Sequence, residues 1–428
     1  TTIVFTGSAN FTMTGTNVYT TGTVSINQGS TSLTGSGTTF TSAMVGRQIF
    51  LSNRWYVISA FGSTTALTLA TAFADANLSG STYRISSVIK DVEFEELTIV
   101  GASGTKVIDA IDVRDINFTD VIISTSGASG LGLEIDNFMS VDSDRFTVSG
   151  IPATTSHGIS ATNGSFLNLR QTATVSNGGS GCVWNNVTTS SIIFSASNAN
   201  TADGYNFTSV DNSFFIIEAA GNGGQGMELV SGCDQNRILP NFTGNTSDGL
   251  KITATSDNNL VIDGAILSNG GYGVNIAASS CDNTNITANV FVTNSSGAVN
   301  DSGTGTLIRG NIGVDDNATS NPNPGTFGGD GSDGALAISS GTTNIDASNA
   351  NIVIKNYSSI SITGTGALGL TYPAPDGTSL VLKSSGNVTI TSSATAAIDL
   401  QGDGATGGTG GGSENASGTA GTTGYSII

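Results

Sequence analysis

Apolar and polar residues alternate with a fixed period between residues 156 and 297. A glycine opens an apolar–x–apolar triplet about every 23 residues, and these glycines are Gly158, Gly181, Gly204, Gly226, Gly249 and Gly273. A second short apolar run follows within each unit, for example at 214–217 and 260–262. Alternation of this kind is typical of strands with one buried face. A repeat of 20–50 residues indicates a solenoid, so the pattern predicts an all-β parallel β-helix with about 23 residues per coil.

A column of asparagines accompanies the repeat. Four residues before successive opening glycines stand Asn177, Asn200, Asn222, Asn245 and Asn269. Asparagine tolerates tight turns, and coils stacked about 4.8 Å apart would bring these amides within hydrogen-bonding reach of one another. A buried polar column is stable only when every member has a partner. We therefore expect a structural ladder of amides inside the coil.

The rest of the chain divides by composition. Residues 1–21 alternate threonine with apolar residues and form a strand segment for assembly or attachment. Residues 22–88 form a small β module, with a hairpin turn at Ser52-Asn53. The β-helix occupies 89–313, and 314–331 is a proline- and glycine-containing linker. Short strands return over 332–400. The glycine-rich tail, 401–428, is expected to pack into a neighbouring subunit or a glycine-rich bundle, or to lie along its own body.

Three stretches resemble known proteins. GSGTTFT (35–41), VGRQI (45–49) and TTALTL (64–69) resemble small β modules of bacteriophage tail and virion proteins. The block from GDGSDGALAISSGTTNI (329–345) to IVIKNYSSISITGTGALGL (352–370) resembles C-terminal regions of large surface and fibre proteins. Together with the repeat, the chain resembles phage tail-spike and tail-fibre proteins built on a right-handed, pectin-lyase-like β-helix. The resemblance implies an elongated, homotrimeric, extracellular protein.

Charge limits the partners. Only 11% of residues are charged, and the formal net charge is −19. Nucleic acids and anionic membrane surfaces are bound by clustered Lys and Arg, which this chain lacks. No apolar run approaches the length of a membrane span, so membrane insertion is not expected. The remaining partners are further copies of the chain and a cell-surface polysaccharide or receptor.

The three cysteines are expected to be free. Cys182 falls in an inward column of the repeat, where a thiol packs as a small apolar group. Cys233 and Cys281 share a column but stand two coils apart, about 9–10 Å, which is too far for a disulfide.

Carboxylates are the main candidates for chemistry. Asp211, Asp234, Asp257 and Asp282 fall in one turn column, each followed by Asn or Gln. Their expected spacing of about 5 Å matches a retaining glycosidase. Turn capping, Ca²⁺ binding (Asp234, Asp257, Asp282) and catalysis (Asp211, Asp234) all stay open. Asp203 and Asp248 precede opening glycines two coils apart, about 9–10 Å, close to the spacing of an inverting pair. An Asp-Gly turn is the other interpretation.

Other catalytic motifs are incomplete. His157 is the only histidine, so it is the one possible base of a Ser-His-Asp arrangement, and no nucleophile elbow surrounds it. Histidine–cysteine metal sites are excluded by the same scarcity. Pectin-degrading β-helix enzymes carry a Gly-His-Gly and an Arg-x-Lys. Here His157-Gly158 lacks the first glycine, and Lys251 lacks the arginine. No cofactor is expected apart from the Ca²⁺ considered above.

Aromatic residues of the module offer one further site. Trp55 and Tyr56 form either a surface on which sugar rings stack or part of the module's core.

Three functions are consistent with these patterns. The first is a structural and attachment subunit of a phage tail spike or fibre that binds a surface glycan or receptor. The second is a subunit of a prokaryotic surface filament or adhesin that polymerises through its termini. The third is a polysaccharide depolymerase, a glycoside hydrolase or polysaccharide lyase, on the same β-helix.

Overall fold

The structure is a computed structural model that describes residues 1–5, 10–102, 106–125, 130–152, 156–314, 332–346, 352–371, 379–384, 387–394, 397–398 and 426–427. The chain forms two compact units, 1–321 and 322–428. Their boundary lies within 314–331, the segment predicted as a linker; of that segment only residue 314 is among the described residues. Among the described residues, no helix is long and apolar enough to cross a membrane.

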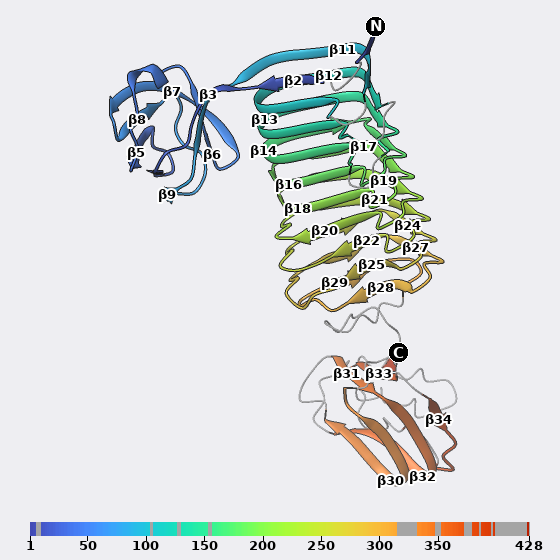
Figure 1. Ribbon diagram of the computed structural model, residues 1–428. Coiled ribbons are helices and arrows are strands. Elements are labelled where there is room, and N and C mark those ends of the chain that lie inside the picture. The colour runs from blue at the N-terminus through green and yellow to red at the C-terminus, as the bar shows by residue number, and fades with distance from the viewer. Residues whose placement is uncertain are drawn as a thin grey trace, which may run out of the picture. The chain divides into compact units, whose positions relative to one another are not determined.

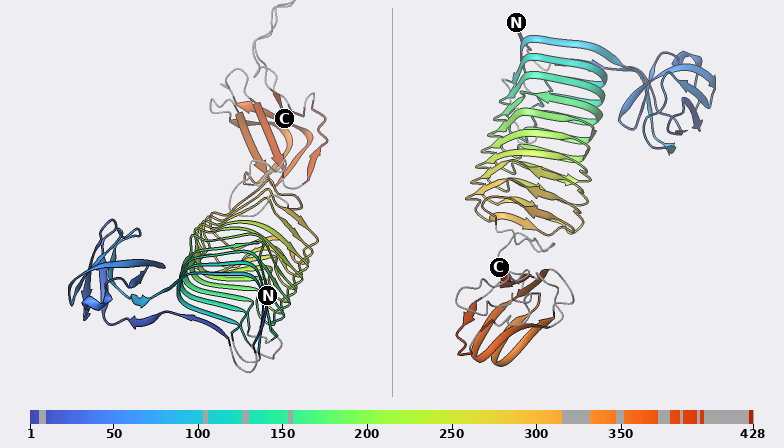
Figure 2. Two further views of the ribbon diagram at one scale, coloured as in Figure 1. Left: turned by 90° about the horizontal axis from the view of Figure 1, so that it is seen from above. Right: turned by 180° about the vertical axis from the view of Figure 1, so that it is seen from behind.

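The first unit contains a parallel β-helix, which confirms the predicted all-β fold (Figures 1 and 2). It has about 11 turns of about 24 residues. The long strands of the first coils are β11 (Ile89–Gly101), β12 (Ile108–Thr125), β13 (Leu133–Ser149) and β14 (Ile159–Arg170). The middle coils contain β15 (Ala173–Val175), β16 (Cys182–Thr188), β17 (Ser191–Asn198), β18 (Tyr205–Asp211), β19 (Phe214–Ala220), β20 (Met227–Ser231) and β21 (Arg237–Thr243). The last coils contain β22 (Leu250–Ile252), β23 (Leu260–Ile262), β24 (Ala265–Leu267), β25 (Tyr272–Ile276), β26 (Asn285–Thr287), β27 (Val290–Val292), β28 (Gly297–Asp301) and β29 (Leu307–Arg309).

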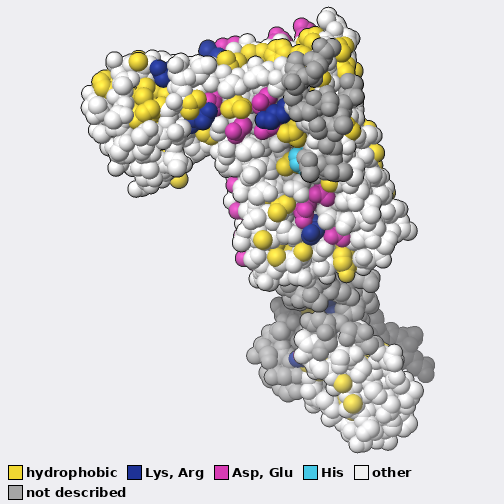
Figure 3. All heavy atoms as spheres, viewed as in Figure 1, with side chains coloured by type: hydrophobic (Ala, Val, Ile, Leu, Met, Phe, Trp, Pro, Cys, Tyr) yellow, Lys and Arg dark blue, Asp and Glu magenta, His cyan; other side chains and the backbone are white. Residues whose placement is uncertain are grey.

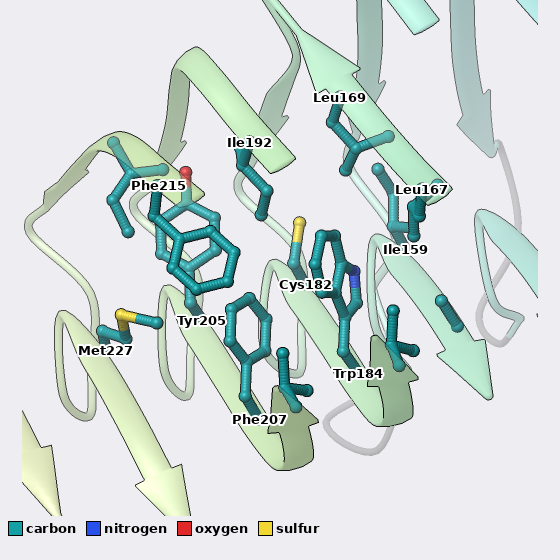
Figure 4. Close-up of a cluster of buried hydrophobic side chains, with 14 of the residues drawn as sticks. Ile159, Leu167, Leu169, Cys182, Trp184, Ile192, Tyr205, Phe207, Phe215 and Met227 are labelled. Carbon is teal, nitrogen blue, oxygen red and sulfur yellow. The ribbon is translucent and has the colours of Figure 1, made fainter. Parts of the chain in front are cut away.

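The interior of the β-helix is filled by columns of apolar side chains. Cys182 pairs in register with Tyr205, and Tyr205 with Met227, and all three side chains are buried (Figure 4). In the neighbouring column the Trp184 ring stacks on Phe207 with 4.8 Å between ring centroids. Such aromatic pairs contribute roughly 0.5–1.5 kcal/mol beyond the area they bury. All three cysteines of the chain are free and buried, as the spacing predicted.

The five asparagines stack inside the coil as a hydrogen-bonded ladder. The Oδ1 atom of Asn200 accepts the main-chain N–H of Asn177 (3.1 Å) and its Nδ2 (2.9 Å). The same pair of bonds joins each asparagine to the next, and the ladder continues to Asn294. The five predicted members are at most 2% exposed. Each amide thus supplies an acceptor to the coil before it, so the buried turn has no unpaired donor at this position.

A second polar ladder, which the sequence analysis did not identify, lies just before the second strand of each middle coil. The Ser190 hydroxyl accepts the N–H of Leu167, and the Ser213 hydroxyl accepts the N–H of Ser190. Asn236 and then Asn259 continue it through their Oδ1 atoms. Each step spans 23 residues, so the signal was present in the sequence, but the column changes from serine to asparagine after Ser213, and no single residue type marks it.

The N-terminal segment belongs to the first coils and does not stand apart. Strand β1 (Thr2–Val4) pairs parallel with β11, and β2 (Phe11–Thr14) pairs parallel with β12. Only β3 (Thr16–Tyr19) joins the module. The assembly segment expected at 1–21 is therefore divided between two parts of its own chain.

The module is an eight-stranded antiparallel sheet with the strand order β3-β10-β6-β7-β8-β5-β4-β9. Its strands after β3 are β4 (Thr23–Ile26), β5 (Ser32–Ser36), β6 (Gln48–Leu51), β7 (Arg54–Ser63), β8 (Ala66–Leu69), β9 (Leu78–Ser81) and β10 (Arg84–Ser87). Ser52 and Asn53 both have positive φ, 47° and 63°, and link β6 to β7 as the predicted two-residue hairpin turn.

The second unit is also built from parallel pairs. One sheet contains β30 (Ala335–Asp346), β32 (Ser359–Thr371) and β34 (Val388–Ile390); the other contains β31 (Ile352–Tyr357), β33 (Ser379–Ser384) and β35 (Ser426–Ile427). In the predicted glycine-rich tail, 401–425 and 428 lie outside the described residues. The described end, β35, pairs with β33 of its own chain.

The asparagine ladder yields a stability prediction. Asn222→Ala removes the acceptor of the Asn200 N–H and the donor to the Ser197 carbonyl in a fully buried turn. We expect the free energy of unfolding to fall by about 2–4 kcal/mol, the cost of leaving buried polar groups unpaired. Chemical denaturation followed by circular dichroism measures this. Asn185→Ala, at an exposed position of the same β-helix, serves as the control and should change it by less than about 0.5 kcal/mol. Equal effects of the two changes would contradict a ladder role.

Candidate functional site

One outward column of the β-helix carries ionisable or amide side chains on most of its coils. Its members are register partners on successive coils, and we call them the polar column: Asp109, Glu134, Ser160, Val183, Asn206, Glu228, Lys251, Asn275 and Asn300. They alternate with the inward core residues of the same strands, so the two-residue period of the strand presents them to solvent. Figure 3 shows acidic and basic side chains grouped above and below the single histidine.

Hydrogen bonds connect the lower half of the polar column. Lys251 Nζ lies 2.8 Å from Glu228 Oε1, and Asn206 Nδ2 donates to Glu228 Oε2 at 3.2 Å. The same Asn206 amide donates to Asp203 Oδ2 at 2.9 Å. Further along, Asn300 Nδ2 donates to Asn275 Oδ1 at 2.9 Å. The side chains are ordered by one another and remain 17% (Glu228) and 29% (Lys251) exposed, so their outer edges stay available to a ligand.

An ion-paired lysine occupies the upper half. Lys106 Nζ lies 2.7 Å from Glu134 Oε2 and 3.2 Å from Asp109 Oδ1. Burial lowers the pKa of Lys106, but its hydrogen bonds to Glu134 and Asp109 outweigh this, and the net pKa is raised. The lysine therefore stays charged, and the column presents cations and anions together.

Asp203 and Asp248 lie beside this column in a turn ladder. Asp203 Oδ1 accepts the N–H of Gln225 at 2.8 Å, and the Gln225 side chain accepts the N–H of Asp248 at 3.0 Å. Asp248 Oδ1 in turn accepts the N–H of Tyr272 at 2.7 Å. One oxygen of each carboxylate is thus fixed to the next coil. Both carboxylates therefore act as acceptors for turn N–H groups. Gln225 lies between Asp203 and Asp248, the two residues whose expected spacing was close to that of an inverting pair.

His157 is the first member of the same turn column. Its Nδ1 accepts the N–H of Ser180 at 3.1 Å, which places the ring proton of the neutral imidazole on Nε2. Burial lowers the pKa of His157, and the negative charge of Asp203 opposes that shift. With Nδ1 engaged by the backbone and Nε2 protonated, the ring has no free nitrogen to accept a proton, so it cannot act as a general base in this arrangement.

The four aspartates of the other turn column form a third ladder. Asp211 Oδ1 accepts the N–H of Asp234 at 2.9 Å, Asp234 that of Asp257 at 2.7 Å, and Asp257 that of Asp282 at 2.7 Å. The first three therefore each contribute an acceptor to the turn of the next coil, and Asp282 ends the ladder as a donor. Among the described residues, no group of three or more His, Cys, Asp or Glu side chains is arranged to hold a metal ion.

Trp55 and Tyr56 do not form a sugar-stacking surface, which corrects one interpretation of the sequence. Trp55 is 3% and Tyr56 is 6% exposed. The Trp55 ring packs on Phe50, and its Nε1 donates to the carbonyl of Asn137 on the β-helix at 2.8 Å. Tyr56 belongs to the apolar core of the module. At residues 55 and 56 both faces of β7 are covered, one by the module and the other by the β-helix. The alternation within one strand does not show that a second part of the chain packs on it.

An apolar surface that the sequence analysis missed lies on another side of the β-helix. Register partners Ile193, Ile216 and Leu239 face outward and are only partly buried, as are Phe214 and Leu260 in the adjacent column. We call these residues, with Phe194, the apolar face. Phe194 is 70% exposed and has a φ of 53°, where the register shifts between β17 and β19. The signal was the run of consecutive apolar residues at 192–194, 214–217 and 238–240, which places apolar side chains on both faces of the strands.

Comparison with known proteins gives structural similarities only. No family model matches the chain, and no curated protein does. Similar solved structures include the mannuronan C-5 epimerase AlgE4 A-module of Azotobacter vinelandii, with 15% identity, a TM-score of 0.41, and 75% of this chain and 85% of that chain covered. The tailspike protein gp49 of Pseudomonas phage LKA1 has 14% identity, a TM-score of 0.35 and coverages of 92% and 69%. ORF18 of Geobacillus virus E2 has 14% identity, a TM-score of 0.39 and coverages of 51% and 50%. Phage tailspikes are thus among the structures to which this chain is similar. None of these similarities assigns an activity.

The aspartate ladder yields a pH prediction. Burial raises the pKa of Asp211 above its ordinary value of 3.8, and the negative charge of Asp234 raises it further. The hydrogen bond from the Asp234 N–H lowers it, but the net pKa is raised. Below pH 3.8 the carboxyl is protonated in both folded and unfolded chains. As the pH rises through the folded pKa, the folded chain holds a desolvated carboxylate and loses stability.

Asp211→Asn keeps an oxygen for the Asp234 N–H without the charge. We expect it to raise Tm at pH 7 by about 1–2 °C, a small value because the group is partly exposed, with the gain disappearing at pH 3. Differential scanning calorimetry at both pH values tests this. A variant that is less stable at pH 7 would show that the carboxylate charge itself stabilises the turn.

Proposed function

We propose that this chain is an extracellular structural and attachment protein of the phage tail-spike or tail-fibre kind, whose β-helix binds a cell-surface polysaccharide. The observation that carries the proposal is the polar column, in which all members but Val183 carry a polar or charged side chain. Successive coils lie about 4.8 Å apart, so from Asn206 to Asn300 every coil adds a hydrogen-bonding side chain. An extended polymer of hydroxyl-bearing rings presents partners at regular intervals, whereas a compact ligand would meet only one or two coils.

The pairing of charges in the column supports a polysaccharide over a highly charged partner. Lys106 is matched by Asp109 and Glu134, and Lys251 by Glu228. Paired carboxylates still accept hydrogen bonds from sugar hydroxyls, and the amides of Asn206 and Asn275 both donate and accept. The column therefore offers directional hydrogen bonds without a strong field of one sign.

The apolar face supports self-association along the side of the β-helix. Exposed apolar patches on soluble proteins mark interaction surfaces. Strands β1, β2 and β35 each already pair with a strand of their own chain. These observations favour a closed lateral oligomer over a filament that polymerises by exchanging terminal strands. A trimer is the form that the sequence resemblance implies.

Binding to the polar column predicts a loss of affinity on its mutation. Lys251→Ala and Asn206→Ala should each weaken polysaccharide binding at least fivefold, because each removes a donor and releases its partner Glu228 from its fixed position. Affinity electrophoresis in gels containing alginate, pectate, dextran or bacterial capsular polysaccharides measures this. Asn241→Ala, exposed on β21, serves as the control and should bind as the unaltered chain does.

Incubating the protein with the same polysaccharides and assaying the solution for new reducing ends decides between attachment and depolymerisation. Unchanged polymer with retarded protein supports attachment, and new reducing ends or unsaturated products would establish the depolymerase alternative. If Lys251→Ala and Asn206→Ala are both retarded by the polysaccharide as strongly as the unaltered chain, the polar column is not the binding surface.

Self-association predicts a change of mass. Ile216→Asp places a charge at the centre of the apolar face and should convert the oligomer to the 42.9 kDa monomer in analytical ultracentrifugation. Thr208→Asp, at an outward position of β18, is the matched control and should leave the oligomer intact. An unaltered chain that sediments as a monomer at micromolar concentration would overturn this assignment.

A further inference from the structure

A cavity of about 440 Å³ opens where the module meets the β-helix. Small-molecule sites commonly have volumes of about 300–1,000 Å³. The module contributes residues of the β6–β7 hairpin and of the segment around β9 and β10, and the β-helix contributes one asparagine from each of three successive coils. The lining residues are Phe50, Ser52, Asn53, Leu78, Ser81, Thr82, Tyr83, Arg84, Asn137, Asn163 and Asn186.

The β-helix wall of this junction cavity is a column of left-handed corner residues. Asn137, Asn163 and Asn186 have φ values of 51°, 51° and 56°. Asn186 Nδ2 donates to Asn163 Oδ1 at 2.8 Å, and Asn163 Nδ2 donates to Asp136 Oδ1 at 3.2 Å. Hydrogen bonds therefore fix the orientation of these amides before any ligand arrives, which lowers the entropy cost of binding.

The module wall is held against this column by specific contacts. Asn53 Nδ2 donates to Asn186 Oδ1 at 2.9 Å, and Ser165 Oγ donates to the Asn53 carbonyl at 2.7 Å. The Arg54 guanidinium lies 5.0 Å from the centre of the Phe166 ring. Together with the bond from Trp55 to Asn137, these contacts hold the module against the β-helix beside the cavity. The cavity is thus bounded by docked surfaces with complementary polar groups.

Arg84 supplies an oriented donor at the cavity. Its Nε donates to Asp112 Oδ1 at 2.6 Å, and Asp112 is fully buried. The terminal nitrogens of Arg84 make no hydrogen bond to any described residue, and its side chain is 28% exposed. Asn137 Oδ1 is likewise unpartnered among the described residues, while its Nδ2 donates to Asp112. The site therefore presents both a free donor and a free acceptor.

We propose that the junction cavity binds a short neutral saccharide. Asparagine amides and serine and threonine hydroxyls match the alternating donors and acceptors of sugar hydroxyls, and the partly exposed Phe50 ring, held by Trp55, offers an apolar surface to a sugar face. No lining residue is acidic, and the Asp112 carboxylate balances the charge of Arg84. A carboxylated sugar would find no unbalanced cation here, which favours a neutral ring.

This site goes beyond the proposed function because it shares no residue with the polar column. It would recognise one or a few sugar rings in a half-open pocket, whereas the polar column meets an extended polymer.

Titration with defined sugars tests the proposal. The probes are glucose, galactose, N-acetylglucosamine, their di- and trisaccharides, and tri-galacturonic acid, measured on the full chain by isothermal calorimetry and saturation-transfer NMR. We expect at least one neutral probe to bind. Thr82→Trp fills the cavity from an exposed position and should weaken that binding at least tenfold, and Arg84→Gln should weaken it at least fivefold. Thr34→Trp, at an exposed position of β5, adds the same bulk elsewhere and should have no effect.

The outcomes are separable. If Arg84→Gln also lowers Tm by breaking the pair with Asp112, Thr82→Trp still decides, because Thr82 is exposed on the surface. Lys251→Ala should leave binding of the short probes unchanged, which separates this site from the polar column. Three results would overturn the proposal. The first is that no neutral probe binds at 10 millimolar, about the weakest affinity of interest. The others are selective binding of tri-galacturonic acid and binding by Thr82→Trp that equals binding by the unaltered chain.

Discussion

The structure depends on the pairing of buried turn amides between successive coils. Each coil of the β-helix must bring its chain through a turn whose main-chain N–H groups are shielded from water, and an unpaired buried N–H costs about 1–3 kcal/mol. Asparagine at 200 supplies the missing acceptor to residue 177, and residue 222 does the same for residue 200. A slip of one residue would break this pairing in every coil at once. The ladder therefore fixes the register, and the register fixes which columns face outward.

Everything proposed about binding follows from that register. Glu228 and Lys251 can form an ion pair because they are partners on adjacent coils, although 23 residues separate them in the chain. Ile193 and Ile216 become neighbours on the surface by the same rule. A β-helix thus converts a sequence repeat into vertical stripes, some mainly polar and others mainly apolar. Polar, apolar and turn stripes lie on different sides, so separate contacts with a polymer and with neighbouring subunits need not compete.

The sequence predicted the columns in which one residue type recurs at a fixed offset, and it missed columns of mixed residue type and contacts without a period. The amide column was readable because asparagine recurs at a fixed offset from the opening glycines, and the inward column of Cys182 and Tyr205 followed from the same period. Docking of the module on the β-helix has no period: the bonds from Trp55 to Asn137 and from Asn53 to Asn186 join residues 82 and 133 positions apart. For this reason the sequence left open that Trp55 lies on the surface, whereas the structure buries it. The junction cavity had no signal in the sequence.

Hydrogen–deuterium exchange of the intact chain, resolved by residue, tests the central claim most directly. The main-chain N–H groups of Asn177, Asn200, Asn222 and Asn245 each have an amide oxygen of the next coil as acceptor. They should exchange only through global unfolding and be among the slowest in the protein. Exchange of these four amides within seconds, at the rate of exposed turns, would show that the buried asparagines do not fix the coils.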